Sequence, residues 1–285
     1  MKLRHIAVLT IAGAMTVLCL AGCSDAAKMQ TVSGAGLEQL GQITVITREE
    51  GSGTREVFAE SVGFYDASTG RDRTLDSAKQ AESGTDVIDL VSSEKSAIGY
   101  VSLGALDGGN SKALHTVTVD GKSLDRKFYL AYSGSLSDLE QDFLAYVKGA
   151  GQALVGENFT AVNKTTSFLS LKPSGSLRIG GSTSVSGLMQ ELAQAYMEYN
   201  PNASVEVVET DSTNGLTGAM SGIYDLGMSS RELKDYEKEL LQYEVIAKDE
   251  IAVIVNKDNS LENISSEDLK AVYTGEIANW KELNQ

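Results

Sequence analysis

The chain has 285 residues, 42% of them hydrophobic, which is enough for one or two globular domains with a sizeable core. Its 39 acidic residues outnumber the 24 Lys and Arg residues and give a formal charge of −15. This balance argues against a nucleic-acid partner, which needs clustered cations. Both cysteines lie before residue 24, so the rest of the chain has no thiol for a disulfide, a metal or catalysis.

The first 23 residues have the pattern of a secretory signal. Lys2 and Arg4 precede an apolar stretch that is shorter than the roughly 20 residues a membrane-spanning helix needs. The stretch ends in LAGC, which resembles a bacterial lipobox, so Cys23 is the expected lipidation site. An ordinary signal peptide with a chance cysteine is the alternative. Residues 24–42 are small and polar and are predicted to be a tether.

From residue 43 onward, short β-type runs alternate with helical segments. The first half of the chain is predicted to contain strands at 43–47, 97–102, 115–120 and 128–133, helices at 54–63 and 86–93, and a polar loop at 64–80. Apolar residues at helical spacing predict one helix or a helix pair over 136–155. Residues 163–176 lack periodicity and hold one of the two prolines, so they are predicted to be a linker.

The second half of the chain continues the alternation. Its predicted strands are 177–179, 204–209, 226–228 and 251–255, and its predicted helices are 184–199, 213–223, 232–240 and 265–273. The alternation of strands and helices predicts an α/β protein with mainly parallel sheets.

At four places a β-type run leads into a turn rich in Gly, Ser and Thr that opens a helix. These turns are 48–54, 180–184, 211–215 and, more weakly, 227–230. The first N–H groups of a helix have no internal partner and lie at the positive end of its dipole, so such a turn can bind an anion. Ordinary N-capping explains any single turn better. Four such turns, one of them beside Arg48, favour a shared tetrahedral oxyanion site.

Other chemistries fit the sequence poorly. Gly121-Lys122-Ser123 resembles the end of a P-loop, but residue 116 is Thr where the motif needs Gly. His115 is the only histidine after the signal segment, and we expect it to face solvent from a strand. Neither a zinc site nor a Ser–His–Asp arrangement can be assembled, so we expect no enzyme, no metal and no cofactor. A serine hydrolase that uses one of the Ser turns is the alternative from the enzyme class, and the missing histidine partner counts against it.

Several segments resemble the phosphate-binding lipoproteins of bacterial ABC phosphate importers. They include ITVITREEGSGTREVF, SAIGYVSLGAL, LRIGGSTSVSGLMQELAQAYMEYNP, DLGMSSREL and IAVIVNKDNSLENISSEDLKAVYTGEIANW, and the likeness covers most of 41–160 and 177–285. The resemblance implies a two-lobed type II periplasmic-binding-protein fold that closes on inorganic phosphate. It also implies an extracytoplasmic, lipid-anchored monomer that delivers phosphate to an ABC permease in the membrane.

The order of these segments departs from the family. Members usually begin with GGSTSV and run through IAVIVN and YTGEIANW into the REEGSGTR turn, whereas this chain starts near that turn and ends at GEIANWKELNQ. We therefore expect a circular permutation whose old termini are joined by 163–176. One lobe would then be 126–255 and the other 43–122 plus 256–285. A tandem duplication, or a gene that continues past Gln285, is the alternative.

The resemblance assigns the ligand residues by motif position. They are Thr183 and Ser184, Ser212, Ser230, and, from the facing lobe, Arg48, Ser52, Gly53 and Thr54. Arg48 would supply a charge-assisted hydrogen bond, and Glu50 is expected to orient it. The alternative for Arg48 is a surface charge that pairs with Glu49.

Selectivity is less evident from the sequence. Some family members have Asp where Ser230 stands, and that carboxylate accepts the proton of hydrogen phosphate. Asp211 is either a substitute acceptor or a helix N-cap, and we favour the cap. Sulfate or molybdate binding, or a sensing or scavenging paralogue without a transport role, is therefore the alternative function.

Overall fold

The computed structural model describes residues 36–106 and 109–283. The predicted signal peptide, Cys23 and most of the predicted tether lie outside the described residues. Residues 37–42, which the sequence assigned to the tether, belong instead to the folded part. The 3-10 turn η1 (Leu37–Gln39) buries Leu37 to 2% exposure against a hydrophobic core, and Gln42 pairs with Asn279 in a β-bridge.

The hydrophobic cores divide the described chain into two groups of residues. Two core clusters are built from residues 37–124 and 251–283, and two others from residues 128–247. We call the first group the terminal lobe and the second the central lobe, and place their boundary at the strands β7 (Asp125–Tyr132) and β12 (Gln242–Asn256).

The terminal lobe has a small parallel sheet covered by helices. Its elements are β1 (Thr44–Arg48), α1 (Gly53–Val62), β2 (Tyr65–Asp66), β3 (Arg71–Asp72), β4 (Lys79–Ala81), α2 (Gly84–Ser93), β5 (Ala97–Ser102), η2 (Leu103–Leu106), η3 (Asn110–Ala113), β6 (Leu114–Val119), β13 (Asn263–Ile264), α8 (Ser266–Thr274) and η4 (Trp280–Glu282). β1 pairs in parallel with both β4 and β5, which places the end of β1 at the carboxyl edge of this sheet.

Aromatic side chains from both ends of the chain form the centre of the terminal lobe. Phe58 on α1 stacks on Tyr100 of β5 with ring centroids 4.0 Å apart, and both rings contact Tyr273 of α8. Phe64 stacks on Tyr273 as well, and Trp280 is fully buried nearby in the same core. The lobe therefore needs the segment after residue 251 to complete its core.

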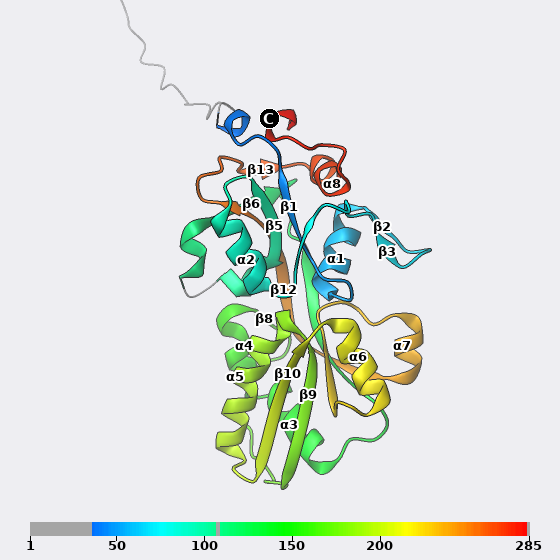
Figure 1. Ribbon diagram of the computed structural model, residues 1–285. Coiled ribbons are helices and arrows are strands. Elements are labelled where there is room, and N and C mark those ends of the chain that lie inside the picture. The colour runs from blue at the N-terminus through cyan, green and yellow to red at the C-terminus, as the bar shows by residue number, and fades with distance from the viewer. Residues whose placement is uncertain (1–35, 107–108, 284–285) are drawn as a thin grey trace, which may run out of the picture. The chain divides into compact units, whose positions relative to one another are not determined.

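The central lobe repeats the strand–helix alternation over one continuous stretch. Its elements are α3 (Asp138–Lys148), α4 (Gln152–Asn158), β8 (Thr160–Ala161), β9 (Gly175–Ser182), α5 (Thr183–Tyr199), β10 (Ala203–Thr210), α6 (Ser212–Ser221), β11 (Leu226–Ser229) and α7 (Asp235–Leu240). β9 pairs in parallel with β10 and β11, and α5 and α6 lie on either side of β9 and β10 in Figure 1. The helices α5 and α6 both begin at the carboxyl ends of their strands, on the side that faces the terminal lobe (Figure 1).

The strand β12 connects the two lobes without interruption. It pairs with β7 over Gln242–Glu250 and with β5 over Ile251–Val255, so it belongs to both sheets (Figure 1). The sequence predicted only 251–255 as a strand, because the all-apolar run begins there and the preceding residues mix apolar side chains with polar and charged ones. Within residues 36–106 and 109–283, the antiparallel strand pairs other than the β2–β3 hairpin all involve β7 or β12.

Most other predicted elements agree with the structure to within three residues at each end. The stretch 136–155 is a helix pair, α3 and α4, and Ser265 caps α8 through the N–H of Asp268. The predicted polar loop 64–80 contains the short strands β2, β3 and most of β4. His115 is half-buried rather than solvent-facing, because its Nε2 lies 2.8 Å from the carbonyl oxygen of Leu261.

Candidate oxyanion-binding site

The first turn of the site joins β1 to α1 in the terminal lobe. Gly51 has a positive φ of 88°, a conformation that glycine adopts without strain, and it turns the chain into the helix. Ser52 is the N-cap of α1, and its hydroxyl accepts a hydrogen bond from the N–H of Arg55. Ser52 and Thr54 are buried, with 4% and 1% exposure, although both are polar. The turn therefore presents backbone N–H groups and two hydroxyls towards the interior.

Two facing turns come from the central lobe. α5 begins at Thr183 directly after β9, and α6 begins at Ser212 directly after Asp211. The side chain of Asp211 accepts a hydrogen bond of 2.8 Å from the N–H of Asn214, so Asp211 is the N-cap that the sequence analysis favoured. Gly181 precedes α5 with a φ of 142°, and a Cβ there would lie 2.2 Å from the carbonyl oxygen of Met228. Only glycine permits this close packing of the turn on β11.

Ser230 follows β11 and is bound to both neighbouring turns. Its hydroxyl accepts a hydrogen bond of 2.9 Å from Ser182, and its N–H donates one of 3.0 Å to the hydroxyl of Ser212. Ser212 and Ser230 are both fully buried. The three turns of the central lobe thus form one hydrogen-bonded group at the helix N-termini.

The turns of the two lobes meet directly. A guanidinium N–H of Arg48 donates to Thr183 Oγ1 at 2.8 Å, and Thr54 Oγ1 lies 2.8 Å from Ser184 Oγ. A Cβ on Gly53 would lie 2.5 Å from Ser212 Oγ and 2.8 Å from Ser230 Oγ.

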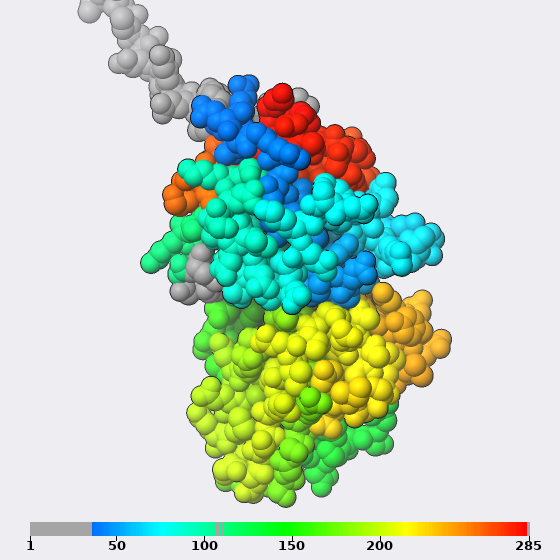
Figure 2. Space-filling view, in the orientation of Figure 1, coloured from blue at the N-terminus to red at the C-terminus, as the bar shows by residue number. Residues whose placement is uncertain are grey.

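The structure therefore brings together seven of the eight ligand residues that the resemblance assigned, across the boundary between the lobes. The eighth, Ser52, lies in the same turn and caps α1. Figure 2 shows the lobes in contact along this face.

Arg48 is held by Glu49 rather than by Glu50. Its Nε and Nη2 donate hydrogen bonds of 2.7 Å to the two carboxylate oxygens of Glu49, so the predicted role of Glu50 is wrong. The Arg48 side chain is only 2% exposed, which also excludes a surface charge pair. Burial raises the pKa of Glu49, and the hydrogen bonds and charge of Arg48 oppose that rise. The bidentate pair fixes the guanidinium plane while Nη2 still reaches Thr183.

Sequence reasoning missed a second buried arginine, Arg126 on β7. Its Nε donates to Asp249 Oδ2 at 2.7 Å, and its Nη1 donates to Thr54 Oγ1 at 2.5 Å. Burial lowers its pKa and the charge of Asp249 opposes this effect. The sequence did carry a signal, because Arg126 alternates with the core residues Phe128 and Leu130 and so shares their face of the strand.

Arg231, the residue after Ser230, was also missed. It is 1% exposed and forms two hydrogen bonds of 2.8 Å with the buried carboxylate of Glu237. Its Nε lies 3.4 Å from Glu56 on α1, and Lys234 Nζ lies 3.3 Å from the same carboxylate. This cluster is a second, ionic contact between the lobes, beside the hydroxyl-lined one.

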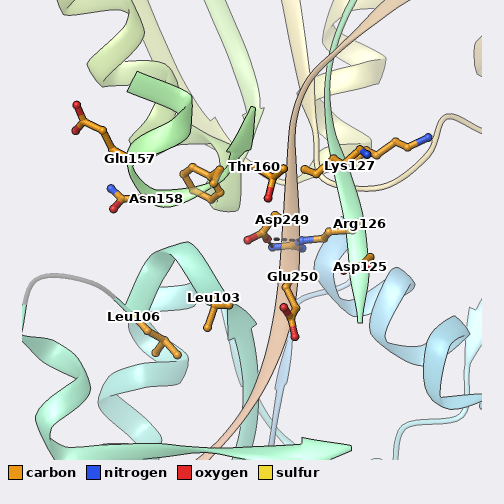
Figure 3. A pocket seen from close by; sticks show the side chains of 12 residues that line it. Leu103, Leu106, Asp125, Arg126, Lys127, Glu157, Asn158, Thr160, Asp249 and Glu250 are labelled. Carbon is orange, nitrogen blue, oxygen red and sulfur yellow. Dashed lines mark hydrogen bonds and ion pairs between the residues drawn. The ribbon is translucent and has the colours of Figure 1, made fainter. Parts of the chain in front are cut away.

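Three cavities flank the contact between the lobes. One of about 370 Å³ is lined by Ser102, Thr183 and Ser184, and one of about 400 Å³ by Ser52, Glu56 and Thr213. The largest, of about 870 Å³, lies beside β7 and β12, and the Arg126–Asp249 ion pair forms part of its wall (Figure 3). Residues of both lobes line each cavity, so a cleft surrounds the hydroxyl-lined contact.

Two further observations concern the residues that the structure describes. Among residues 36–106 and 109–283, no group of three or more His, Cys, Asp or Glu side chains is arranged to hold a metal ion. None of the helices in this part of the chain has both the length and the apolar composition needed to span a bilayer.

Comparison with known proteins identifies the family. The PBP superfamily domain matches residues 166–285. The phosphate-binding protein PstS 2 of Streptococcus pneumoniae is 36% identical over 295 aligned residues, which cover 99% of this chain and 98% of that protein. The chain belongs to the PstS family. PstS 2 of Streptococcus agalactiae is 32% identical over 303 aligned residues, covering 100% of this chain and 99% of that protein.

A solved structure of a phosphate-binding protein confirms the fold. The crystal structure of a phosphate-binding protein of a phosphate ABC transporter from S. pneumoniae superposes with a TM-score of 0.69 at 36% identity, covering 86% of this chain and 100% of that chain. The predicted α/β periplasmic-binding-protein fold is therefore confirmed. The PstS 2 alignments run through nearly the whole of both chains, so these relatives carry the segments in the same order. The permutation relative to other PstS proteins stays a prediction.

Proposed function

We propose that this PstS-family protein binds inorganic phosphate between its two lobes and delivers it to an ABC permease. The proposal includes an extracytoplasmic location, a lipid anchor at Cys23 and a monomeric state. We also propose that the lobes which close on the ligand are 126–255 and 43–122 plus 256–285. Binding is the whole activity, since the relatives named above are binding proteins and one belongs to a transporter.

The observation that carries this proposal is the convergence of three helix N-termini from two lobes. α1, α5 and α6 begin at Gly53, Thr183 and Ser212, and side chains of these turns touch across the lobe boundary. Each N-terminus contributes N–H groups without intrahelical partners and the positive end of a dipole. A tetrahedral oxyanion offers acceptors in several directions, so converging donors from both lobes suit it.

The acidic composition of the protein does not oppose this role. Arg48 and Arg126 are each paired with a carboxylate, so the helix N-termini, hydroxyls and N–H groups supply most of the local attraction for an anion. At physiological salt the Debye length is about 8 Å, so surface carboxylates beyond that distance are largely screened. The formal charge of −15 therefore acts weakly on a ligand held at the buried turns.

Calorimetric titration of the purified chain from residue 24 onward tests the proposal. We expect saturable heat for one phosphate per chain, and we expect Arg48→Ala to weaken binding strongly, because it removes a charge-assisted donor. Arg178→Ala is the matched control, since Arg178 is an exposed arginine paired with Glu206 on neighbouring strands. Absence of heat at millimolar phosphate contradicts the proposal, and unchanged affinity in Arg48→Ala removes Arg48 from the site.

A second candidate is a binder of another oxyanion such as sulfate or molybdate. The observation that favours it is Ser230, a fully buried hydroxyl where some family members place a carboxylate that rejects fully ionised anions. Competition titrations with sulfate and molybdate distinguish the two functions. Phosphate uptake by membrane vesicles that contain the cognate permease distinguishes a transport role from a sensing or scavenging one.

A further inference from the structure

Arg126 lies at the boundary of the lobes and is not among the ligand residues assigned by the resemblance. It stands on β7 directly opposite Asp249 of β12, and both side chains are almost completely buried, at 1% and 2% exposure. Nε and Nη2 both lie 2.7 Å from the same oxygen, Asp249 Oδ2. Figure 3 shows the pair between the two strands at the wall of the large cavity. The carboxylate therefore fixes one edge of the guanidinium.

The remaining edge of Arg126 reaches into the other lobe. Nη1 donates to Thr54 Oγ1 at 2.5 Å, and Thr54 is the second residue of α1. Because a guanidinium can only donate, Thr54 Oγ1 must accept this hydrogen bond with one of its two lone pairs. The hydroxyl proton of Thr54 then points away from Arg126 and can be donated to another acceptor. Ser184 Oγ lies 2.8 Å from Thr54 Oγ1, and either hydroxyl of this pair can be the donor.

Arg48 stands in the same relation to the opposite lobe. It is fixed by Glu49 and donates through Nη2 to Thr183 Oγ1, the first residue of α5. Two carboxylate-fixed arginines thus each donate to the first or second residue of a helix on the facing side of the lobe boundary. Both threonine hydroxyls are left with a proton to donate, which is the polarity that an oxyanion requires.

We propose that Arg126, fixed by Asp249, is a positioning residue that turns the Thr54 hydroxyl into a donor for the bound oxyanion when the lobes close. This inference rests on the proposed function. Arg126 acts through Thr54 and does not itself touch the ligand. The charge of the guanidinium also polarises the Thr54 O–H bond, which strengthens its donation to an anion.

A double-mutant cycle on phosphate affinity tests the inference. The variant Arg126→Gln with Asp249→Asn removes both charges together, so it leaves no unpaired buried ion. We expect it to weaken phosphate binding about tenfold. Thr54→Val removes the hydroxyl at nearly constant shape. If Arg126 acts through Thr54, adding the pair substitution to Thr54→Val weakens binding by less than about twofold more.

Two controls separate positioning from a general structural effect. When the pair substitution is combined with Ser212→Ala, the fold-losses in phosphate affinity of the two changes should multiply. The reason is that no hydrogen bond joins Ser212 to Arg126 or Thr54. Arg178→Gln with Glu206→Gln removes an arginine–carboxylate pair between the neighbouring strands β9 and β10 and should leave the affinity unchanged. Thermal melting without phosphate verifies that each variant is folded. If the fold-losses in phosphate affinity of the pair substitution and of Thr54→Val multiply when the two are combined, the inference is overturned.

A crystal structure of the wild-type phosphate complex decides the question without any variant. We expect Nη1 of Arg126 to lie about 2.5–3.2 Å from Thr54 Oγ1, and Thr54 Oγ1 at a similar distance from a phosphate oxygen. An Arg126 that touches phosphate directly, or a Thr54 turned away from it, overturns the positioning role. If the wild-type chain binds no phosphate, the proposed function fails. If it binds and the pair variant binds equally well, only this inference fails.

Discussion

A single methyl group at Gly53 should prevent the lobes from closing while leaving each lobe intact. Gly53 is the first residue of α1, and its φ lies outside the left-handed region, so alanine fits the helix. The three atoms nearest to an added Cβ all belong to the central lobe. They are Ser212 Oγ at 2.5 Å, Ser230 Oγ at 2.8 Å and the backbone nitrogen of Arg231 at 3.0 Å. The two hydroxyls can rotate, but the backbone nitrogen can retreat only if the lobes separate.

Overpacking of this kind typically costs about 1–3 kcal/mol. Since the cost falls only on the closed state, it should reduce phosphate affinity by roughly 5- to 150-fold. The stability of the ligand-free protein should be unchanged or slightly higher, because alanine restricts the unfolded chain more than glycine does. Calorimetric titration with phosphate measures the first effect, and thermal melting without phosphate measures the second.

Gly84→Ala is the matched control for this prediction. Gly84 is also the first residue of a helix directly after a serine N-cap, and a Cβ there meets no atom within 4 Å. We expect its phosphate affinity to equal that of the wild type. If Gly53→Ala also binds like the wild type, the lobes do not close on the ligand with the contacts described here. A lower melting temperature without phosphate would place the clash inside the terminal lobe.

Three further substitutions probe the arginine and carboxylate groups around the site. Arg48→Lys keeps the positive charge but loses the two-pronged hydrogen bonding to Glu49, so titration should show phosphate binding that is weaker by about tenfold or more. A loss of affinity under twofold contradicts a role for the oriented guanidinium in binding. Glu56→Gln removes the partly exposed ionic contact with Arg231, so phosphate release measured by stopped flow should be about two- to fivefold faster than in the wild type. High salt should reduce this difference in rate, because it screens the ionic contact. A difference in rate that does not change with salt contradicts an ionic contribution of Glu56. Burial alone would raise the pKa of Glu237, but hydrogen bonds from Arg231 and the N–H of Lys234 lower this pKa below 4.5. The ionised Glu237 therefore stabilises the folded protein above pH 4.5, and this stabilisation is lost as the pH falls through the lowered pKa. Urea unfolding from about pH 7 to pH 3 should therefore show a shallower acid loss in Glu237→Gln, and identical slopes would refute the assignment.

The sequence predicted the strand–turn–helix units well because their signals are local. Apolar runs, helical periodicity and capping residues are all contained within a window of a dozen residues, so α1, α5, α6 and α8 were found at nearly their observed positions. The Gly-, Ser- and Thr-rich turns that open these helices were an equally local signal. The pairing of these turns across the lobes came only from the family resemblance, since no local signal relates Thr54 to Ser184, 130 positions later.

The misses have a common physical cause, which is dependence on distant partners. The first half of β12 mixes charged and polar residues with a few apolar ones, and it is a strand because β7 pairs with it over Gln242–Glu250. Arg126 is buried because Asp249 neutralises it from that same strand. The pairing of Arg48 with its direct neighbour Glu49 is the exception. There the choice between Glu49 and Glu50 depends on which face of the turn is buried, and the sequence alone did not determine that face.

The discontinuous core of the terminal lobe has a consequence for the order of folding. The central lobe is one uninterrupted stretch whose core residues run from 128 to 247, so it can condense as soon as that stretch is available. Phe58, Phe64 and Tyr100 appear early in the chain, but Tyr273 and Trp280, which complete their packing, appear last. The closure of such a long loop is intrinsically slow. We therefore expect the terminal lobe to mature after the central lobe, and until then its aromatic side chains lack the packing that Tyr273 and Trp280 supply.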